Sequence, residues 1–135
     1  MSNQEKVAAR ARALVGVPFR PQGRSAGYGL DCVGLAALAA GVPEALVPAD
    51  YRLRSVADQG IEAAQFGGWA LPIPPDDAGT GDVVLVRYAP GQHHLLVLVQ
   101  GGFVHAHAGL GRVVETPGEV AWPRVAAWRV MRGVD

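Results

Sequence analysis

The chain has 135 residues, a length that fits one compact domain, and we expect a single domain over residues 1–135. Twelve Lys and Arg balance twelve Asp and Glu, so no net charge favours nucleic acid or an anionic membrane surface. Because Cys32 is the sole cysteine, it forms no internal disulfide and is either a core residue or a reactive group.

The N-terminal segment Met1–Arg12 is polar and charged, without the apolar core of a secretory signal. The longest strongly apolar run, Leu95–Val99, is far shorter than the roughly 20 residues that span a bilayer. We therefore expect a soluble chain with no signal peptide and no membrane span, cytoplasmic at synthesis.

Apolar residues recur at helical spacing near the N-terminus and predict a helix over Gln4–Leu14, ended by Gly16 and Pro18. The following stretch, residues 16–29, is rich in Gly, Pro and Arg, a composition typical of an irregular loop whose backbone turns sharply. This loop leads directly to Cys32.

The residues around the cysteine predict a second helix. Asp31 is a typical N-cap, and Cys32–Ala40 predicts a short, buried, alanine-rich helix that Gly41 and Pro43 end. Cys32 therefore lies at the first position of a helix.

The second half of the chain changes from helical to strand patterning. Residues 42–79 show weak periodicity, with one short helix indicated near Val56–Gln65, and we expect this stretch to shape a substrate groove. Helices followed by strands predict an α+β domain, with the helices packed on one face of a curved antiparallel sheet of about five strands. The expected strands are Val83–Tyr88, Leu95–Gln100, Phe103–Ala108, Val113–Thr116 and Ala126–Met131.

A cysteine at a helix N-terminus is a candidate nucleophile. The helix dipole and the free N–H groups there stabilise a thiolate near neutral pH, and the same N–H groups can hold an oxyanion. The like charge of Asp31 works against the thiolate, so a histidine from elsewhere would have to complete the activation.

All four histidines fall within one predicted hairpin, so neighbouring strands can supply both a base and the group that orients it. A two-residue turn at Gly101-Gly102 would pair Leu98 with His105. By strand parity, His94 and not His93 then shares the face of His105 and His107. That register leaves His94 four residues from the partner of His105, roughly 13 Å away, so contact needs a wider loop or a strong bend.

Other interpretations of these residues remain open. A lone cysteine in an apolar helix is more often a small core residue than a nucleophile. Clustered histidines also occur as metal sites or by chance at a surface, but a zinc site here would lack a second cysteine or a His-Glu-x-x-His helix. Glycines 23, 27 and 29 precede no Gly-Lys-Ser/Thr and are turn formers rather than a phosphate loop. We expect no metal and no cofactor.

Several motifs resemble those of one family. Leu14-Val-Gly-Val-Pro-Phe-Arg20 and Gly29-Leu-Asp-Cys-Val-Gly-Leu35 are similar to the nucleophile motif of NlpC-type cell-wall cysteine peptidases, Gly-x-Pro-Tyr followed by Gly-x-Asp-Cys-x-Gly-Leu. The later blocks Gly81-Asp82-Val-Val-Leu-Val, His94-Leu-Leu-Val-Leu and Phe103-Val-His-Ala106 resemble that family's further blocks, in the same order. Gln22-Gly-Arg24 and Arg112-Val-Val-Glu115 look like the branch found in phage tails and gene-transfer agents.

The resemblance implies a papain-like fold in which Cys32 is the nucleophile, His94 the general base and His105 the group that orients the base. The usual spacing in the family would select His93 as the base, whereas the local pattern and the strand parity select His94. The implied activity is hydrolysis of peptidoglycan stem peptides, typically between D-γ-glutamate and a diamino acid, through a thioacyl intermediate. His107 would be a neighbour of the site.

Phe19 departs from the resembled family, which usually has a tyrosine here whose hydroxyl lies near the nucleophile. If that hydroxyl assists the oxyanion, this chain must use the Cys32 N–H or another donor. The residues we expect near substrate are Phe19, Arg24, Asp31 and His107. Arg20 and Asp82 are weaker candidates, because charges in loops are usually solvated.

Two alternatives to a peptidase are an inactive wall-binding or phage-tail structural module, and an amidase or acyltransferase on the same scaffold. Related lipid acyltransferases place histidine before cysteine, the reverse of this chain. The expected partners are a peptidoglycan stem peptide and proteins of a phage-tail or gene-transfer-agent particle. Such a particle would deliver the chain to the periplasm or the wall.

Overall fold

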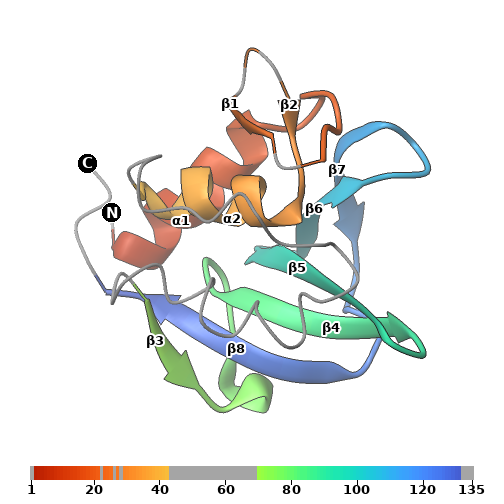
Figure 1. The fold of residues 1–135 in the computed structure, drawn as a ribbon. Helices are drawn as coiled ribbons and strands as arrows, with labels where there is room; N and C mark the ends of the chain where they lie inside the picture. Colours follow the sequence, from red (N-terminus) through yellow and green to blue (C-terminus); the bar gives the residue numbers. More distant parts are fainter. Residues whose placement is uncertain (1, 22, 26, 28, 43–69, 132–135) are drawn as a thin grey trace.

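The computed structural model describes residues 2–21, 23–25, 27, 29–42 and 70–131. Two helices, α1 (Asn3–Ala13) and α2 (Cys32–Ala40), lie together on one side of a sheet (Figure 1). Within the described ranges, neither helix is long and apolar enough to cross a membrane. The strands are β1 (Arg24–Ser25), β2 (Gly29–Leu30), β3 (Ala70–Ile73), β4 (Val83–Ala89), β5 (Gln92–Val99), β6 (Gly102–His107), β7 (Arg112–Pro117) and β8 (Arg124–Val130), with a 3₁₀ turn, η3, at Pro75–Asp77.

Helix α1 begins at a capping box. The Ser2 hydroxyl accepts a hydrogen bond from the Glu5 N–H, and the Glu5 carboxylate accepts one from the Ser2 N–H. These two bonds satisfy backbone donors that the first helical turn would leave free. The helix predicted over Gln4–Leu14 is confirmed, with each end displaced by one residue.

Helix α2 follows the sequence prediction at both ends. The Asp31 carboxylate accepts a hydrogen bond from the Gly34 N–H at 2.9 Å, and Gly41 ends the helix in the left-handed conformation at φ 77°. Eight of its nine residues are buried, and five of the nine are alanines or glycine, so the helix can approach both α1 and β5 closely. This burial fixes the position of Cys32 at the helix start.

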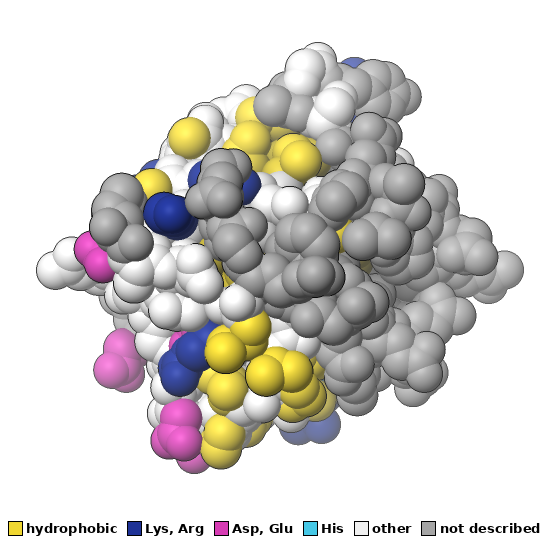
Figure 2. All heavy atoms as spheres, turned by 90° about the vertical axis from the view of Figure 1, so that its left-hand side faces the viewer, with side chains coloured by type: hydrophobic (Ala, Val, Ile, Leu, Met, Phe, Trp, Pro, Cys, Tyr) yellow, Lys and Arg dark blue, Asp and Glu magenta, His cyan; other side chains and the backbone are white. Residues whose placement is uncertain are grey.

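The sheet has six strands in the order β3-β8-β4-β5-β6-β7, and all neighbours are antiparallel. The predicted α+β class is therefore confirmed. The additional strand, β3, contains Pro72 and runs into Pro74 and Pro75, a pattern typical of a loop. Proline is tolerated there because β3 is an edge strand. Figure 2 shows hydrophobic side chains gathered low on the face that includes β3, where Leu71 is exposed.

Each face of the sheet has its own apolar cluster. The larger cluster packs α1 and α2 on residues such as Leu85, Leu95 and Val97. The smaller cluster covers the opposite face and contains Val84, Val86, Leu96, Leu98, Phe103 and Ala127. The helix indicated near Val56–Gln65, and most of the expected groove segment, lie outside the described residues.

The Gly81-Asp82 motif holds the start of β4. The buried Asp82 carboxylate accepts hydrogen bonds from Arg129 Nε at 3.1 Å, Arg129 Nη2 at 2.8 Å and the Gly79 N–H at 2.9 Å. Gly81 has φ 86°, and a side chain there would collide with the backbone of Gln4 in α1. Asp82, a weak candidate for substrate contact, therefore pins β4 to β8 instead.

We predict that Arg129→Met lowers the free energy of unfolding by about 1–3 kcal/mol, because the buried Asp82 carboxylate loses two charged hydrogen bonds. Urea denaturation of the two proteins measures the difference. Arg12→Met is the matched control, since Arg12 bonds the Glu115 carboxylate and the Gln100 carbonyl at the surface, where the Arg12 and Glu115 side chains are 45% and 35% exposed. An exposed pair is worth less than about 1 kcal/mol, so equal losses in the two variants would contradict this role for Asp82.

Candidate active site

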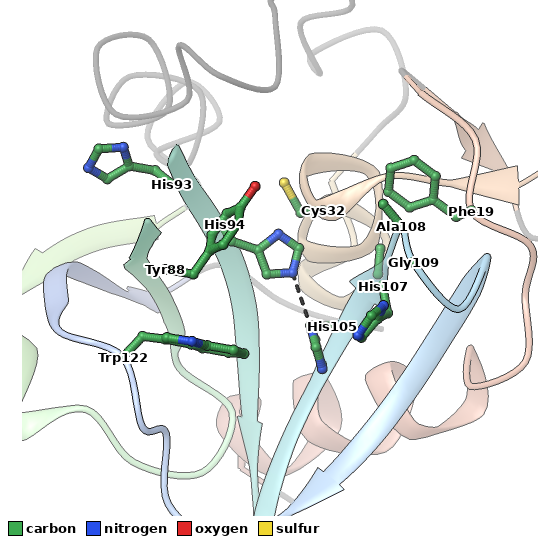
Figure 3. Close-up of a pocket in the computed structure, with 11 residues that line it drawn as sticks. Phe19, Cys32, Tyr88, His93, His94, His105, His107, Ala108, Gly109 and Trp122 are labelled. Atoms are coloured by element: carbon green, nitrogen blue, oxygen red, sulfur yellow. Dashed lines mark hydrogen bonds between the residues drawn. The ribbon is translucent and has the colours of Figure 1, made fainter. Parts of the chain in front are cut away.

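A cavity of about 220 Å³ opens where β5 and β6 separate (Figure 3). The pairing of these two strands ends at Val97 and Val104, whereas β5 continues beside β4, and β6 continues beside β7. The first turn of α2 lies at this opening. The cavity lining includes Cys32, all four histidines, Phe19, Tyr88 and Trp122.

Cys32 and His94 reach this cavity from opposite faces of the sheet. Cys32 belongs to the cluster beneath the helices, together with Leu95. His94 pairs with Val86, which belongs to the cluster on the other face. An unbroken β5–β6 ladder would separate the two side chains, so the divergence of the strands brings them into one site.

The histidines form a chain of polar contacts. His94 Nε2 lies 3.3 Å from His105 Nδ1, and His105 Nε2 lies 3.3 Å from Thr116 Oγ1. If each Nε2 carries its proton, both contacts are hydrogen bonds, and His94 Nδ1 is left as an acceptor. This nitrogen points toward Cys32 (Figure 3). The arrangement matches what a general base for the thiol requires.

The β5–β6 register differs from the sequence prediction. Leu98 pairs with Phe103, not His105, because the turn lies at Gln100-Gly101, where Gly101 has φ 83°. The displacement is by an even number of residues, so the predicted parity of His94 is unchanged. It also brings His94 closer to His105 than the predicted register allowed, and neither a wider loop nor a strong bend is needed.

Burial dominates the electrostatics of Cys32, which is 2% exposed. Desolvation raises the pKa of the thiol to about 12, and the charge of Asp31 adds to the rise. The N–H groups of Leu95 and Val33 favour the thiolate but do not overcome the burial. The expected thiolate near neutral pH is therefore wrong for this resting structure, in which Cys32 is a neutral thiol.

The two contacting histidines are neutral as well. Burial, together with nearby His105 and His107, lowers the pKa of His94 to about 3. Burial and His107 lower the pKa of His105 to about 4. At neutral pH the site therefore holds an uncharged thiol beside uncharged imidazoles.

Of the other expected residues, two line the cavity. Phe19 is held at its rim by a hydrogen bond from its N–H to the Gly111 carbonyl at 2.8 Å. His107 accepts a hydrogen bond from the Leu110 N–H through Nδ1 at 3.0 Å, which ties its ring to the β6–β7 turn. His93 also lines the cavity but points away from Cys32 (Figure 3).

The remaining candidates contribute less to the site. Asp31 is fully buried, and its carboxylate caps α2. The side chain of Arg24 lies outside the described part of the structure. Across residues 2–42 and 70–131, wherever positions are described, no three His, Cys, Asp or Glu side chains are grouped as metal ligands would be.

Sequence reasoning missed Thr116 and Tyr88. Thr116 is diagonal to His105 across the β6–β7 ladder, in which His105 pairs with Val114. That relation depends on a register that the sequence does not fix. Tyr88 follows Val86 at alternate spacing on β4, and this parity was the available signal that it faces the histidines.

No family model and no curated protein matches the chain. Solved structures do match. The NlpC/p60 domain of the peptidoglycan hydrolase SagA superposes with a TM-score of 0.63 at 16% identity, covering 97% of this chain and 100% of that one. The peptidoglycan hydrolase RipB from Mycobacterium tuberculosis gives 0.61 at 22% identity, covering 97% and 66%.

This chain has the NlpC/p60 fold. A third match shows that the fold does not by itself imply catalysis. RipD from Mycobacterium tuberculosis, with a TM-score of 0.57 at 19% identity over 97% of this chain and 99% of that one, is described as a non-catalytic NlpC/p60 protein adapted to peptidoglycan binding. The activity must therefore be argued from the site.

We predict that alkylation of Cys32 by iodoacetamide accelerates steadily from pH 6 to pH 10 without a plateau. Only the thiolate reacts, and burial raises the pKa of this thiol to about 12. The same reaction in concentrated urea is the control, because the unfolded thiol should titrate near its ordinary pKa and react faster at pH 8. A plateau at neutral pH in the folded protein would contradict the neutral thiol.

Proposed function

We propose that the chain is a cysteine peptidase that hydrolyses peptide stems of peptidoglycan. The observation that carries this proposal is the shared cavity of Cys32, His94 and His105, with His94 bonded through Nε2 and its Nδ1 directed at the thiol. A nucleophile, a base and a group that orients the base are the parts that thiol catalysis needs.

The neutral resting state determines the order of the steps. Because Cys32 and His94 are both uncharged, the thiol proton moves to His94 Nδ1 while the sulfur attacks the carbonyl carbon of the bound substrate. The carbon–sulfur bond forms and a tetrahedral oxyanion develops. His94 then protonates the amine as the carbon–nitrogen bond breaks, which leaves a thioacyl enzyme. Water attacks this thioester while His94 takes the water proton. The carbon–sulfur bond then breaks, His94 returns a proton to the Cys32 sulfur, and the acid is released.

The contacts of His105 and Thr116 beyond His94 position the His94 ring. As His94 gains a proton, its Nε2–H donates to His105 Nδ1, and His105 Nε2–H donates to Thr116 Oγ1. These contacts hold the ring with Nδ1 toward the thiol. His105 and Thr116 are therefore positioning residues and not proton carriers.

The substrate class is supported by the fold and the motifs. SagA and RipB, which share the fold, are described as peptidoglycan hydrolases. The resemblance around Cys32 points more narrowly to the bond between D-γ-glutamate and a diamino acid. The likeness to phage-tail and gene-transfer-agent proteins supports delivery by such a particle, and sedimentation of the chain with particles from a producing culture tests that route.

A specific observation also favours a second function, a wall-binding module without catalysis. Cys32 is 2% exposed, its pKa is raised, and Phe19 brings no hydroxyl to the cavity. RipD provides an example of the same fold described as peptidoglycan-binding. One experiment distinguishes a wall-binding module from a hydrolase.

We predict that the chain releases soluble fragments from purified sacculi and that Cys32→Ala releases none, because the thiol forms the covalent intermediate. Release is measured by chromatography, and mass spectrometry identifies the bond that is cut. A new amine on the stem diamino acid supports the peptidase, whereas cleavage between sugar and peptide would identify an amidase. Sedimentation of both proteins with intact sacculi, without fragments, would identify the binding module.

We also predict that His105→Leu lowers kcat by about 100-fold, because the His94 ring loses the contact that orients it. His105→Asn should retain more activity than His105→Leu, since an amide can still bond to His94 Nε2. Steady-state kinetics on a defined stem peptide measure both variants, and circular dichroism checks their fold. Equal activity in the two variants would contradict a positioning role for His105.

A further inference from the structure

The attack of a thiol on a carbonyl places negative charge on the carbonyl oxygen, and this oxygen needs hydrogen-bond donors. The N-terminus of α2 offers the Cys32 and Val33 N–H groups, which also act on the sulfur, whereas the Gly34 N–H is already bonded to Asp31. Phe19, at the rim of the cavity, has no polar atom in its side chain. A side-chain donor to this oxygen would therefore come from another residue of the lining.

Most polar side chains of the described lining are engaged or directed elsewhere. His94 and His105 contact each other, and the His107 ring, whose Nδ1 accepts from the Leu110 N–H, is directed away from the Cys32 sulfur (Figure 3). His93 points away from Cys32 (Figure 3). Trp122 packs against Phe103 and His105, with ring centroids 6.0 and 6.1 Å apart, on the far side of the histidines from the thiol.

Tyr88 differs from these residues in the direction of its hydroxyl. The side chain lines the same cavity as Cys32, and its oxygen points to the side of the cavity where the sulfur lies (Figure 3). Tyr88 is 49% exposed, so the residue remains accessible to an incoming ligand.

Two features of the fold direct this side chain. The β4–β5 register shifts between Arg87 and Ala89, so Tyr88 is the additional residue of a bulge. Bulges next to active sites re-aim side chains in this way. The Tyr88 ring also stands edge-on to His94, with centroids 6.2 Å apart and planes at 80°, a favourable aromatic geometry. The ring is therefore held by the base itself.

We propose that the Tyr88 hydroxyl donates a hydrogen bond to the substrate carbonyl oxygen when Cys32 attacks, and so forms an oxyanion hole with the Cys32 N–H. This inference rests on the proposed peptidase function and adds a catalytic residue to it. As the carbon–sulfur bond forms, the carbonyl π pair moves to oxygen, and Tyr88 keeps its proton throughout. The hydroxyl enters from β4 and not from the position of Phe19.

Tyr88→Phe tests the proposal, because it removes the hydroxyl and keeps the ring against His94. On a defined stem peptide, kcat should fall by about 100-fold while KM changes by less than about threefold. Alkylation of Cys32 by iodoacetamide should stay within about twofold of wild type, because alkylation forms no oxyanion. Unchanged kcat, or an alkylation rate that falls together with kcat, would overturn the proposal.

A peptide aldehyde separates this inference from the proposed function. N-acetylglycinal adds reversibly to a thiol and forms a tetrahedral adduct whose oxygen occupies the oxyanion position. Its dissociation constant, measured by protection of Cys32 from alkylation, should rise about tenfold or more in Tyr88→Phe. This result would support Tyr88 even if the wild type cuts no stem peptide. Equal affinity in the two proteins overturns the role of Tyr88, and failure of the wild type to form the adduct overturns both proposals.

Discussion

The site depends on the separation of β5 from β6. While the two strands are paired, as far as Val97 and Val104, the sheet isolates the helix side from the opposite side. Beyond that point the strands stay paired only with their outer neighbours, and the Leu95 N–H acts on the Cys32 sulfur. One backbone N–H of β5 thus acts within the site. A residue from the helix layer and histidines from the far face can then share one cavity.

The same construction explains why the site is uncharged at rest. Enclosing the thiol between α2 and the sheet raises its pKa, and enclosing His94 lowers the pKa of the imidazole, so burial opposes an ion pair from both sides. The dipole and the N–H groups at the helix start are too weak to reverse this desolvation. Under the proposed mechanism, charge separates only once a substrate that supplies its own dipoles occupies the cavity.

Local patterns in the sequence predicted the helices and the parity of the site. Helix α2 begins after the Asp31 cap and ends at Gly41, as expected. Strand alternation selected His94 over His93 as the residue that contacts His105. Apart from Tyr88, the failures are non-local. The β5–β6 register, the edge strand with Pro72, the contact of Thr116 with His105 and the desolvation of Cys32 depend on which segments pack together. No single stretch of the sequence encodes those relations.

The start of β7 has one further consequence for ligands. The segment from Gly16 to Phe19 already occupies that edge, with hydrogen bonds from Gly16 to the Val113 carbonyl and from Val113 to the Val17 carbonyl. An extended peptide therefore cannot pair with this part of β7 as another strand. Recognition along this edge must rely on side chains and on the shape of the cleft. The peptide stem proposed as substrate, with its D-residues and γ-linkages, does not depend on such strand pairing.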